Sequence, residues 1–238
     1  MPLKVEFHSH TSGDPQDAIP HTAVQLIDRA AALGYHALAI TLHNKQIDLE
    51  PLRAHAATRR VVLIPGLERS IQRRHVLLFN FSARAEAVTS FEQIAELKHD
   101  EPGLVIAPHP FFPVSNCLGQ DLMDRYAGVF DAVEVNAMYA PGLNFNRRAV
   151  SWAAHHGKPL VGNGDVHRLV QLGTTYSLVD ADPNPASLCE AVRAGRVEVR
   201  TQPLSWFQAV AIFGDIIGAW AFHPARHTKP RRETSSAA

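Results

Sequence analysis

The sequence has 238 residues, 46% of them hydrophobic and 19% charged, which is typical of one α/β domain with a large core. Its 23 basic and 23 acidic side chains cancel, so the total charge gives no sign of nucleic-acid binding, although a local basic groove could lie within a neutral total. Cys117 and Cys189, the two cysteines, lie too far apart in sequence for C-x-x-C spacing, which excludes a disulfide framework and a thiolate zinc site. No basic and then apolar signal segment precedes the first predicted strand, so we expect a cytoplasmic protein.

Short apolar strands alternate with amphipathic helices along the chain. The predicted strands span residues 3–7, 37–41, 61–64, 75–81, 104–107, 132–135, 160–161, 174–179 and 197–200. The predicted helices span residues 22–33, 48–59, 91–98, 121–126, 146–156 and 185–194. Successive βα units of this kind indicate an α/β fold with a mainly parallel sheet.

The predicted domain covers residues 1–203, and a different composition follows it. Residues 204–222 are nearly all apolar and are about long enough to cross a bilayer. Asp215 at the centre of this stretch would be costly in a membrane. We therefore expect residues 204–223 to form a helix that docks on the domain or joins two copies into a homo-oligomer. Residues 224–238 are predicted to be a disordered tail.

A His-x-His pair follows the first predicted strand. Side chains two residues apart in a strand point to the same face, so His8 and His10 project together beyond the strand end. Two neutral imidazoles held in this way can bind one metal ion if other ligands complete the shell. The sequence contains 14 histidines, an unusually high number.

Similar polar residues follow the later apolar strands. The set comprises His8, His10, His43, Glu68, His109, Asp165 and His167. In a βα barrel the carboxyl ends of the strands meet at one face, where active sites form. An open doubly wound sheet would also gather these residues at its carboxyl edge, over a narrower crevice.

These motifs, taken in order, resemble the PHP (polymerase and histidinol phosphatase) superfamily of metal-dependent phosphoesterases. The family's H-x-H-T motif resembles residues 8–11, with Asp14 beyond it, and its T-D-H motif resembles residues 41–43. Its strand-end Glu, the following His, the His-Pro pair and the final G-x-D-x-H motif resemble Glu68, His75, residues 109–110 and residues 164–167.

The resemblance implies a distorted (β/α)7 TIM-like barrel of the PHP type that holds two or three divalent transition-metal ions. His8, His10, Glu68 and Asp165 would hold the first ion. Glu68 would bridge to a second ion held by His75 and His109, and Asp14, His43 and His167 would hold the third. Nitrogen and oxygen ligands without thiolates suit Zn, Mn or Fe.

The chain departs from the family at Leu42, where relatives usually have an Asp. Losing an outer support of a ligand can weaken metal affinity about 10–100-fold, so the third ion is expected to be held most weakly. Asp17 is close enough in sequence to substitute for Asp14. Glu134 and Asn136 end a strand at the same face and could support the ligands or line a pocket.

Other polar residues have weaker signals. Lys45 and Arg168, next to predicted ligands, could bind a substrate phosphate. The remaining histidines are interpreted as helix or tail residues without a metal role; they are His21, His36, His55, His99, His155, His156, His223 and His227.

The predicted reaction is hydrolysis of a phosphate ester by a metal-bound hydroxide. His109 or His167 would protonate the leaving group, and Glu68 would complete the catalytic set. Neutral charge and the lack of an aromatic and basic stripe favour a small phosphorylated metabolite or nucleotide over long nucleic acid. An amidohydrolase-type enzyme and a catalytically inactive metal-binding regulatory module are the alternatives.

Overall fold

The computed structural model describes residues 1–113, 115–212 and 214. The strands of these residues are β1 (Leu3–Glu6), β2 (Ala37–Ala39), β3 (Val62–Ile64), β4 (Gly66–Ile71), β5 (Arg74–Phe79), β6 (Leu104–Ala107), β7 (Ala132–Asn136), β8 (Leu160–Asn163), β9 (Thr175–Val179) and β10 (Val197–Thr201). The helices are α1 (Ala23–Ala32), α2 (Glu50–Thr58), α3 (Phe91–Asp100), α4 (Gly119–Arg125), α5 (Asn146–His155) and α6 (Pro185–Arg193), with short 3-10 helices η1 (Ala83–Glu86) and η2 (Leu169–Gln171).

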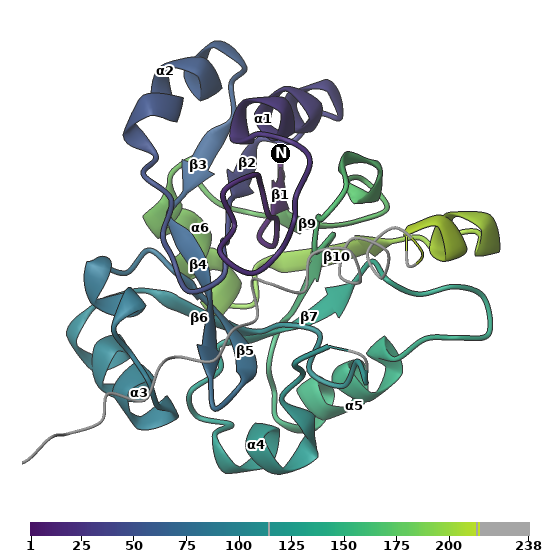
Figure 1. Ribbon diagram of the computed structural model, residues 1–238. Helices are drawn as coiled ribbons and strands as arrows, with labels where there is room; N and C mark the ends of the chain where they lie inside the picture. Colours follow the sequence, from purple (N-terminus) through teal and green to yellow (C-terminus); the bar gives the residue numbers. More distant parts are fainter. Residues whose placement is uncertain (114, 213, 215–238) are drawn as a thin grey trace, which may run out of the picture.

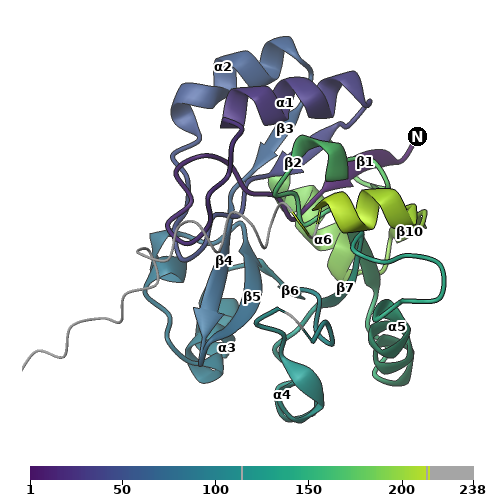
Figure 2. The ribbon, with the colours of Figure 1, turned by 45° about the vertical axis from the view of Figure 1, so that its right-hand side comes forward.

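The described strands form two five-stranded sheets. Their orders are β10-β9-β1-β2-β3 and β4-β5-β6-β7-β8. Each sheet combines a parallel part, β1-β2-β3 or β6-β7-β8, with antiparallel pairs contributed by β9 and β10 or by β4 and β5. Figure 1 shows α1 and α2 beside the first sheet and α3, α4 and α5 at the opposite end of the molecule. The turned view in Figure 2 keeps these two groups apart.

Two short parallel bridges connect loops and strands of the two sheets. Ser9, after β1, pairs with Val166, after β8, and His43, after β2, pairs with Glu68 in β4. The second bridge includes hydrogen bonds from Glu68 N to Leu42 O (3.1 Å) and from Asn44 N to Glu68 O (2.8 Å). The polar residues predicted from both halves of the chain therefore meet where the sheets approach each other.

Local sequence signals explain where three of the described α-helices begin. Thr22 caps α1 through a capping box with Gln25, whose side chain accepts a bond from Thr22 N. Ser90 caps α3, and Asn184 caps α6 just before Pro185. Gly34, directly after the end of α1, has φ +72°, a conformation that a side chain would disfavour.

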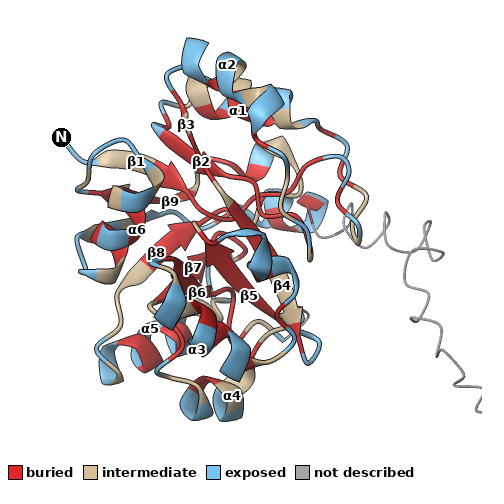
Figure 3. Ribbon diagram, turned by 90° about the vertical axis from the view of Figure 1, so that its left-hand side faces the viewer, coloured by how far each residue is buried: buried red, intermediate tan, exposed pale blue. Residues whose placement is uncertain are grey.

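Apolar side chains pack on both sides of the sheets. One cluster lies between the second sheet and α3, α4 and α5, with Phe91, Phe130 and Trp152 among its buried members. A second joins α1, α2 and the first sheet, and a third lies between the two sheets and α6. Figure 3 shows buried strands and helices whose outer faces are exposed. Packing on both sides of the sheets therefore holds the ends of the strands in place.

The α/β class is confirmed, but two expectations about the sheet are corrected. The strands are mainly parallel only within each three-stranded part, because the β4–β5 hairpin forms an antiparallel pair. In the first sheet, β9 pairs antiparallel with both β1 and β10, and α6 connects β9 to β10. In the described part of the chain the strands pair as two sheets, and a closed seven-stranded barrel is not seen. The predicted strand end at Glu68 lies inside β4, which the sequence reading missed.

The C-terminal expectations are tested over a short range only. Residues 206–212 and 214 are helical, and Leu204, Ala209 and Ile212 pack against Met138 and Ala140. The rest of the predicted helix over 204–223, and the tail over 224–238, lie outside the described residues. Among the residues described, no helix is long and apolar enough to cross a membrane.

Candidate metal centre

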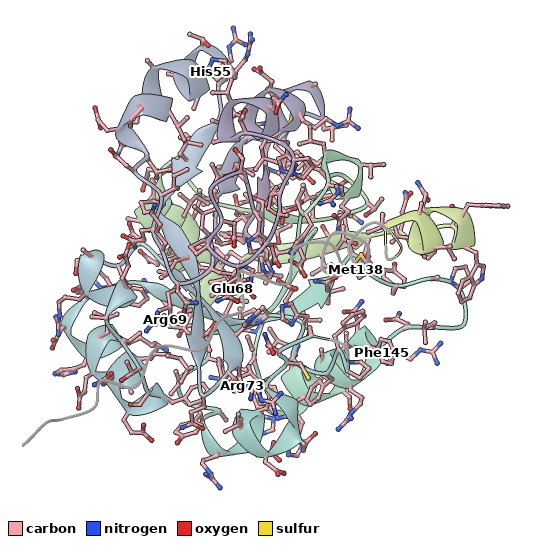
Figure 4. The ribbon with its side chains drawn as sticks, viewed as in Figure 1. His55, Glu68, Arg69, Arg73, Met138 and Phe145 are labelled. Atoms are coloured by element: carbon pink, nitrogen blue, oxygen red, sulfur yellow. The ribbon has the colours of Figure 1, made fainter. Side chains whose placement is uncertain are left out.

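Glu68 is the centre of a buried cluster of imidazoles. It is 1% exposed, and Figure 4 shows its label near the middle of the molecule. Five histidines direct one ring nitrogen towards its carboxylate. Oε2 lies 3.3 Å from His8 Nε2, 3.3 Å from His10 Nε2 and 3.0 Å from His43 Nε2, and Oε1 lies 2.6 Å from His75 Nδ1 and 3.3 Å from His109 Nε2.

The two oxygens of Glu68 therefore face different sets of histidines. The first set comes from the loops after β1 and β2, and the second comes from β5 and the loop after β6. A carboxylate can bind a cation through each of its oxygens. This division of the imidazoles is the arrangement expected of a carboxylate that bridges two ions.

The ring nitrogen of each imidazole that does not face Glu68 contacts another polar side chain. His8 Nδ1 lies 2.8 Å from Glu134 Oε2. Glu134 is fully buried and also accepts hydrogen bonds from Asn163 Nδ2 (3.0 Å), Asn136 Nδ2 (2.8 Å) and His109 N (3.2 Å). A carboxylate bound to the far nitrogen fixes the orientation of a metal-binding imidazole. Glu134 thus supports His8, and Asn136 supports Glu134.

The remaining imidazoles are held in the same way. Asp14 Oδ2 lies 3.0 Å from His10 Nδ1 and 3.1 Å from His43 Nδ1. The other two partners come from one loop: Ser115 Oγ lies 3.0 Å from His109 Nδ1, and Asn116 Nδ2 lies 3.1 Å from His75 Nε2. In every case the nitrogen left over is the one directed at Glu68.

Asp165 and His167 form the more exposed side of the cluster. Asp165 Oδ1 lies 3.4 Å from His8 Nε2 and 3.6 Å from His10 Nε2, so it shares these two imidazoles with Glu68. His167 Nδ1 lies 3.4 Å from Asp165 Oδ1, and its Nε2 lies 3.1 Å from Asp17 Oδ2. The side chains of Asp165, His167 and Asp17 are 19%, 16% and 26% exposed, which places this side next to solvent.

Three residues in or next to the cluster have an unusual backbone conformation. His109, Asp165 and Asn44 have φ of 29°, 47° and 57°, in the left-handed region that residues other than glycine rarely adopt. Such strain persists where the surrounding structure holds it, often at functional sites. Asn44 Oδ1 accepts bonds from Ser70 N and Arg69 Nη1, which hold the turn after His43 against β4.

Charge and burial shift the pKa values in opposite directions across the cluster. Burial opposes ionisation of Glu68, but the imidazoles of His75, His43 and His8 hold its pKa well below the usual value. For His43, burial opposes protonation, yet Glu68 and Asp14 raise its pKa to about 9. Burial likewise opposes charge on His8 and His10, whose pKa values the surrounding carboxylates raise well above normal. Anionic carboxylates are thus concentrated where cations would be stabilised.

Unpartnered buried atoms show that the residues fit metal ions. His8 Nε2 and His10 Nε2 are fully buried without a hydrogen-bond partner, an arrangement that is costly unless another group satisfies the nitrogen. Four overlapping groups could each hold a cation: His8–His10–Asp165, His8–Glu68–His109, His10–Asp14–His43 and His43–Glu68–His75. The donors are nitrogen and oxygen atoms only, the chemistry that suits Zn, Mn or Fe.

The structure thus brings all nine predicted metal ligands together. Their individual roles stay predictions, and one contact differs from the expected grouping: His167 meets Asp17, whereas Asp14 meets His10 and His43. Four supporting residues were not predicted from the sequence: Ser115 and Asn116, described above, and Glu6 and Asn163. Glu6 accepts bonds from His8 N and Gly164 N, and Asn163 Oδ1 accepts from Phe7 N.

The described contacts of the other predicted residues lie outside the group of imidazoles around Glu68. Lys45 is exposed, two residues beyond His43, and Arg168 Nη1 donates to His167 O. His55 lies on α2 and pairs with Asp28 at 2.9 Å, while His156 stacks on Trp152. His21 Nε2 donates to the carbonyl of His10 (2.9 Å), so it steadies the loop after β1.

Comparison with known proteins finds similarity to one family model and to several solved structures. Residues 144–197 match the family model described as PHP-associated. The fold is similar to that of a two-domain protein from Bacteroides vulgatus described as containing a predicted PHP-like metal-dependent phosphoesterase, with TM-score 0.63 and 18% identity over 85% of this chain and 65% of that one. The structural similarity shows a shared PHP-like fold, and the family match covers residues 144–197. No curated protein matches the sequence.

Other solved structures show the range of proteins with this PHP-like fold. The lesion-specific endonuclease PfuEndoQ from Pyrococcus furiosus has TM-score 0.55 and 17% identity over 84% of this chain and 58% of that one. An amidohydrolase from Chromobacterium violaceum has TM-score 0.55 and 16% identity over 90% and 96%. This chain spans less than two thirds of the Bacteroides vulgatus protein and of PfuEndoQ, at 65% and 58% of their lengths. At these identities the similarity concerns the fold alone.

Proposed function

We propose that this protein is a metal-dependent phosphoesterase that hydrolyses a phosphate ester at a centre of two or three divalent Zn, Mn or Fe ions. The observation that carries the proposal is the convergence of five imidazoles on Glu68. Each imidazole has one nitrogen held by another group and the other directed into the cluster. An ionised carboxylate offers about four lone-pair sites, fewer than the five imidazoles that are directed at Glu68.

Two sets of residues that share Glu68 would hold two of the metal ions. His8, His10, Asp165 and Glu68 would hold one ion, and Glu68, His75 and His109 would hold a second. When bound, such ions lower the pKa of a water molecule and stabilise charge on phosphoryl oxygens. Glu134 and Asp14 keep the imidazoles turned so that this arrangement requires no reorientation of the rings.

When the third, outer ion is absent, His167 is better placed than His109 to give a proton to the leaving group. His109 has Nδ1 at Ser115 and Nε2 at Glu68 and is 5% exposed. His167 lies at the more exposed side, with Nε2 at Asp17. A group at this side can reach a substrate oxygen and exchange protons with solvent. Lys45 and Arg168 follow His43 and His167 directly or closely, and we propose them as contacts to the substrate phosphate.

The substrate is proposed to be a small phosphorylated metabolite or a nucleotide. The net charge of zero supports this choice, because binding to long nucleic acid depends on clustered basic side chains. DNA containing a lesion is the second substrate class to test, since the fold is shared with a lesion-specific endonuclease. Neither class is distinguished by the metal cluster itself, which acts on the phosphate.

An amidohydrolase-type reaction is the second candidate, favoured by the fold shared with an amidohydrolase. Among the described residues, the candidate metal groups contain only histidine and carboxylate side chains. The bridging position of the carboxylated lysine common in amidohydrolases is filled by Glu68. An inactive regulatory module was suggested by Leu42 alone, and Asp14 already supplies the support to His43 that Leu42 cannot.

The test combines metal analysis with a substrate panel. Purified protein should contain two or three transition-metal ions per chain by inductively coupled plasma mass spectrometry. It should release phosphate from phosphomonoesters or nucleotides, and chelation should abolish this activity until metal is restored. The panel should include abasic duplex DNA and N-acyl amino acids. Full phosphatase activity of metal-free protein would refute the proposal, and amide hydrolysis without phosphate release would favour the second candidate.

A further inference from the structure

Hydrogen-bond donors surround both carboxylate oxygens of Asp14. Its side chain is buried, with Oδ1 at 2.8 Å from Gln16 N and 3.0 Å from Asp17 N. Oδ2 lies 3.0 Å from both His10 Nδ1 and His43 N, and His43 Nδ1 lies 3.1 Å from each oxygen. An ionised carboxylate offers about four lone-pair sites, so these donors already occupy Asp14.

The same contacts determine where two imidazoles point. Because Asp14 holds Nδ1 of both His10 and His43, the Nε2 atoms of both rings are directed at Glu68, at 3.3 Å and 3.0 Å. The two rings stack at 4.6 Å between centroids with a 19° interplanar angle. If Asp14 bound a cation instead, both rings would lose the partner that orients them.

Asp17 lies three residues beyond Asp14 in the same loop, but its carboxylate is more exposed and has fewer hydrogen-bond partners. Its side chain is 26% exposed. Among the described residues, its carboxylate forms one hydrogen bond, at 3.1 Å from His167 Nε2, and lies 3.7 Å from His43 Nδ1. Ligand atoms about 2.0–2.2 Å from one Zn ion lie roughly 3–3.5 Å apart in tetrahedral geometry. The separation of Asp17 and His167 fits a shared cation.

We infer that this loop divides two carboxylate roles, with Asp14 as a positioning residue for His10 and His43 and Asp17 as the carboxylate that would bind the outer cation with His167. The inference rests on the proposed metal centre and changes one member of its ligand set. It also explains how His43 keeps its orientation although Leu42 cannot hydrogen-bond to it. The short sequence distance between the two aspartates allows one loop to reach both positions.

The test compares Asp14→Asn and Asp17→Asn in the full chain, with Asp121→Asn on the exposed face of α4 as the matched control. Metal-stripped proteins are titrated with Zn²⁺ by calorimetry, and their final metal content is measured. Asp17→Asn should lose the outer ion and keep the others at wild-type affinity. Asp14→Asn should weaken the ions held by His10 and His43 about 10–100-fold, the usual cost of losing a support to a ligand.

A second readout follows the imidazoles without metal or activity. Nitrogen-15 NMR of the stripped protein reports which ring nitrogen of each histidine carries the proton. The signals of His10 and His43 should change in Asp14→Asn and stay unchanged in Asp17→Asn. Because Asp17 is at the surface, its variant should fold even if Asp14→Asn does not, and it alone keeps the inference testable.

The outcomes separate this inference from the proposed function. If Asp17→Asn binds the full complement of Zn²⁺ with wild-type affinity, the assignment of Asp17 is wrong. If Asp14→Asn loses one ion while the signals of His10 and His43 stay unchanged, Asp14 is a ligand and not a positioning residue. If wild-type protein binds no metal at all, the proposed function fails, while the NMR result still decides the role of Asp14.

Discussion

Substitution of Glu68 by Gln is the most direct test of the cluster. The change keeps the shape of the side chain but removes its negative charge and replaces one acceptor oxygen by an NH₂ donor. Glu68 has five imidazole nitrogens within 3.3 Å of its oxygens. An amide NH₂ facing two or three of these nitrogens can satisfy only part of that set.

The size of the effect can be worked out from these distances. Two unit charges about 4 Å apart interact by about 4 kcal/mol at the effective dielectric constant of about 20 that suits protein sites. Because each 1.4 kcal/mol is about a tenfold change, one lost unit of charge corresponds to roughly a thousandfold in affinity per ion. Both oxygens face imidazoles of separate sets, so we expect more than one ion to be weakened. Turnover should be almost completely lost.

The assay is metal titration of stripped Glu68→Gln protein, followed by phosphate release from the best substrate. Circular dichroism should show that the fold is retained, because without Glu68 the histidines can lose their extra protons and relieve their mutual repulsion. Glu96→Gln, on the exposed face of α3, is the matched control and should behave as wild type. Wild-type metal content in Glu68→Gln would refute the bridging role.

Three further predictions concern groups around the cluster. Burial opposes protonation of His43, but Glu68 and Asp14 raise its pKa to about 9, so His43 must lose a proton to bind metal. The affinity for metal should therefore rise with pH towards about 9, and the heat of metal binding should depend on the buffer in calorimetry. Equal heats of binding in all buffers would contradict this. The same raised pKa stabilises the metal-free fold at low pH, a contribution lost as pH rises through about 9 in urea titrations. Glu134→Gln should weaken metal binding about 10–100-fold by releasing His8, and unchanged affinity would exclude that support. Gly164→Ala should lower the urea midpoint, because a Cβ would lie 2.7 Å from Val166 Cγ2 and 3.2 Å from Glu6 Oε2; an unchanged midpoint would show that this turn can relax.

Local signals in the sequence were sufficient to place most elements and to collect the ligands. The helix predicted over residues 22–33 and the strand predicted over residues 104–107 depend on neighbouring residues alone, and α1 and β6 confirm them. The cluster could be predicted because polar residues after parallel strands meet wherever the strands pair. His8, His43 and His109 illustrate this, since each directly follows its strand or comes within a few residues of it.

The remaining features depend on contacts that sequence spacing does not determine. The antiparallel pairing of β4 with β5 places Glu68 inside a strand, opposite Leu77, where the sequence indicated a strand end. The choice between Asp14 and Asp17 depends on which of them reaches the backbone amides of its own loop. Glu6 could have been noticed, because a residue two positions before His8 on a strand shares its face.

The departure at Leu42 has a different meaning in the structure from the one that the sequence suggested. Leu42 is 3% exposed and packs in an apolar cluster with Leu26, Ile40 and Leu49. Leu42→Asp would leave a buried carboxylate without a partner, and it would also cost at least the roughly 2–5 kcal/mol of a buried Leu→Ala change. His43 Nδ1 is already bound to Asp14, so the new carboxylate has no free nitrogen to support. We therefore expect Leu42→Asp to lower the urea midpoint of the stripped protein without tightening its weakest ion, whereas the volume-conserving Leu42→Met should cost less than about 1.5 kcal/mol. Tenfold tighter binding in a normally stable Leu42→Asp protein would show instead that support for His43 is incomplete and that this position limits the outer site.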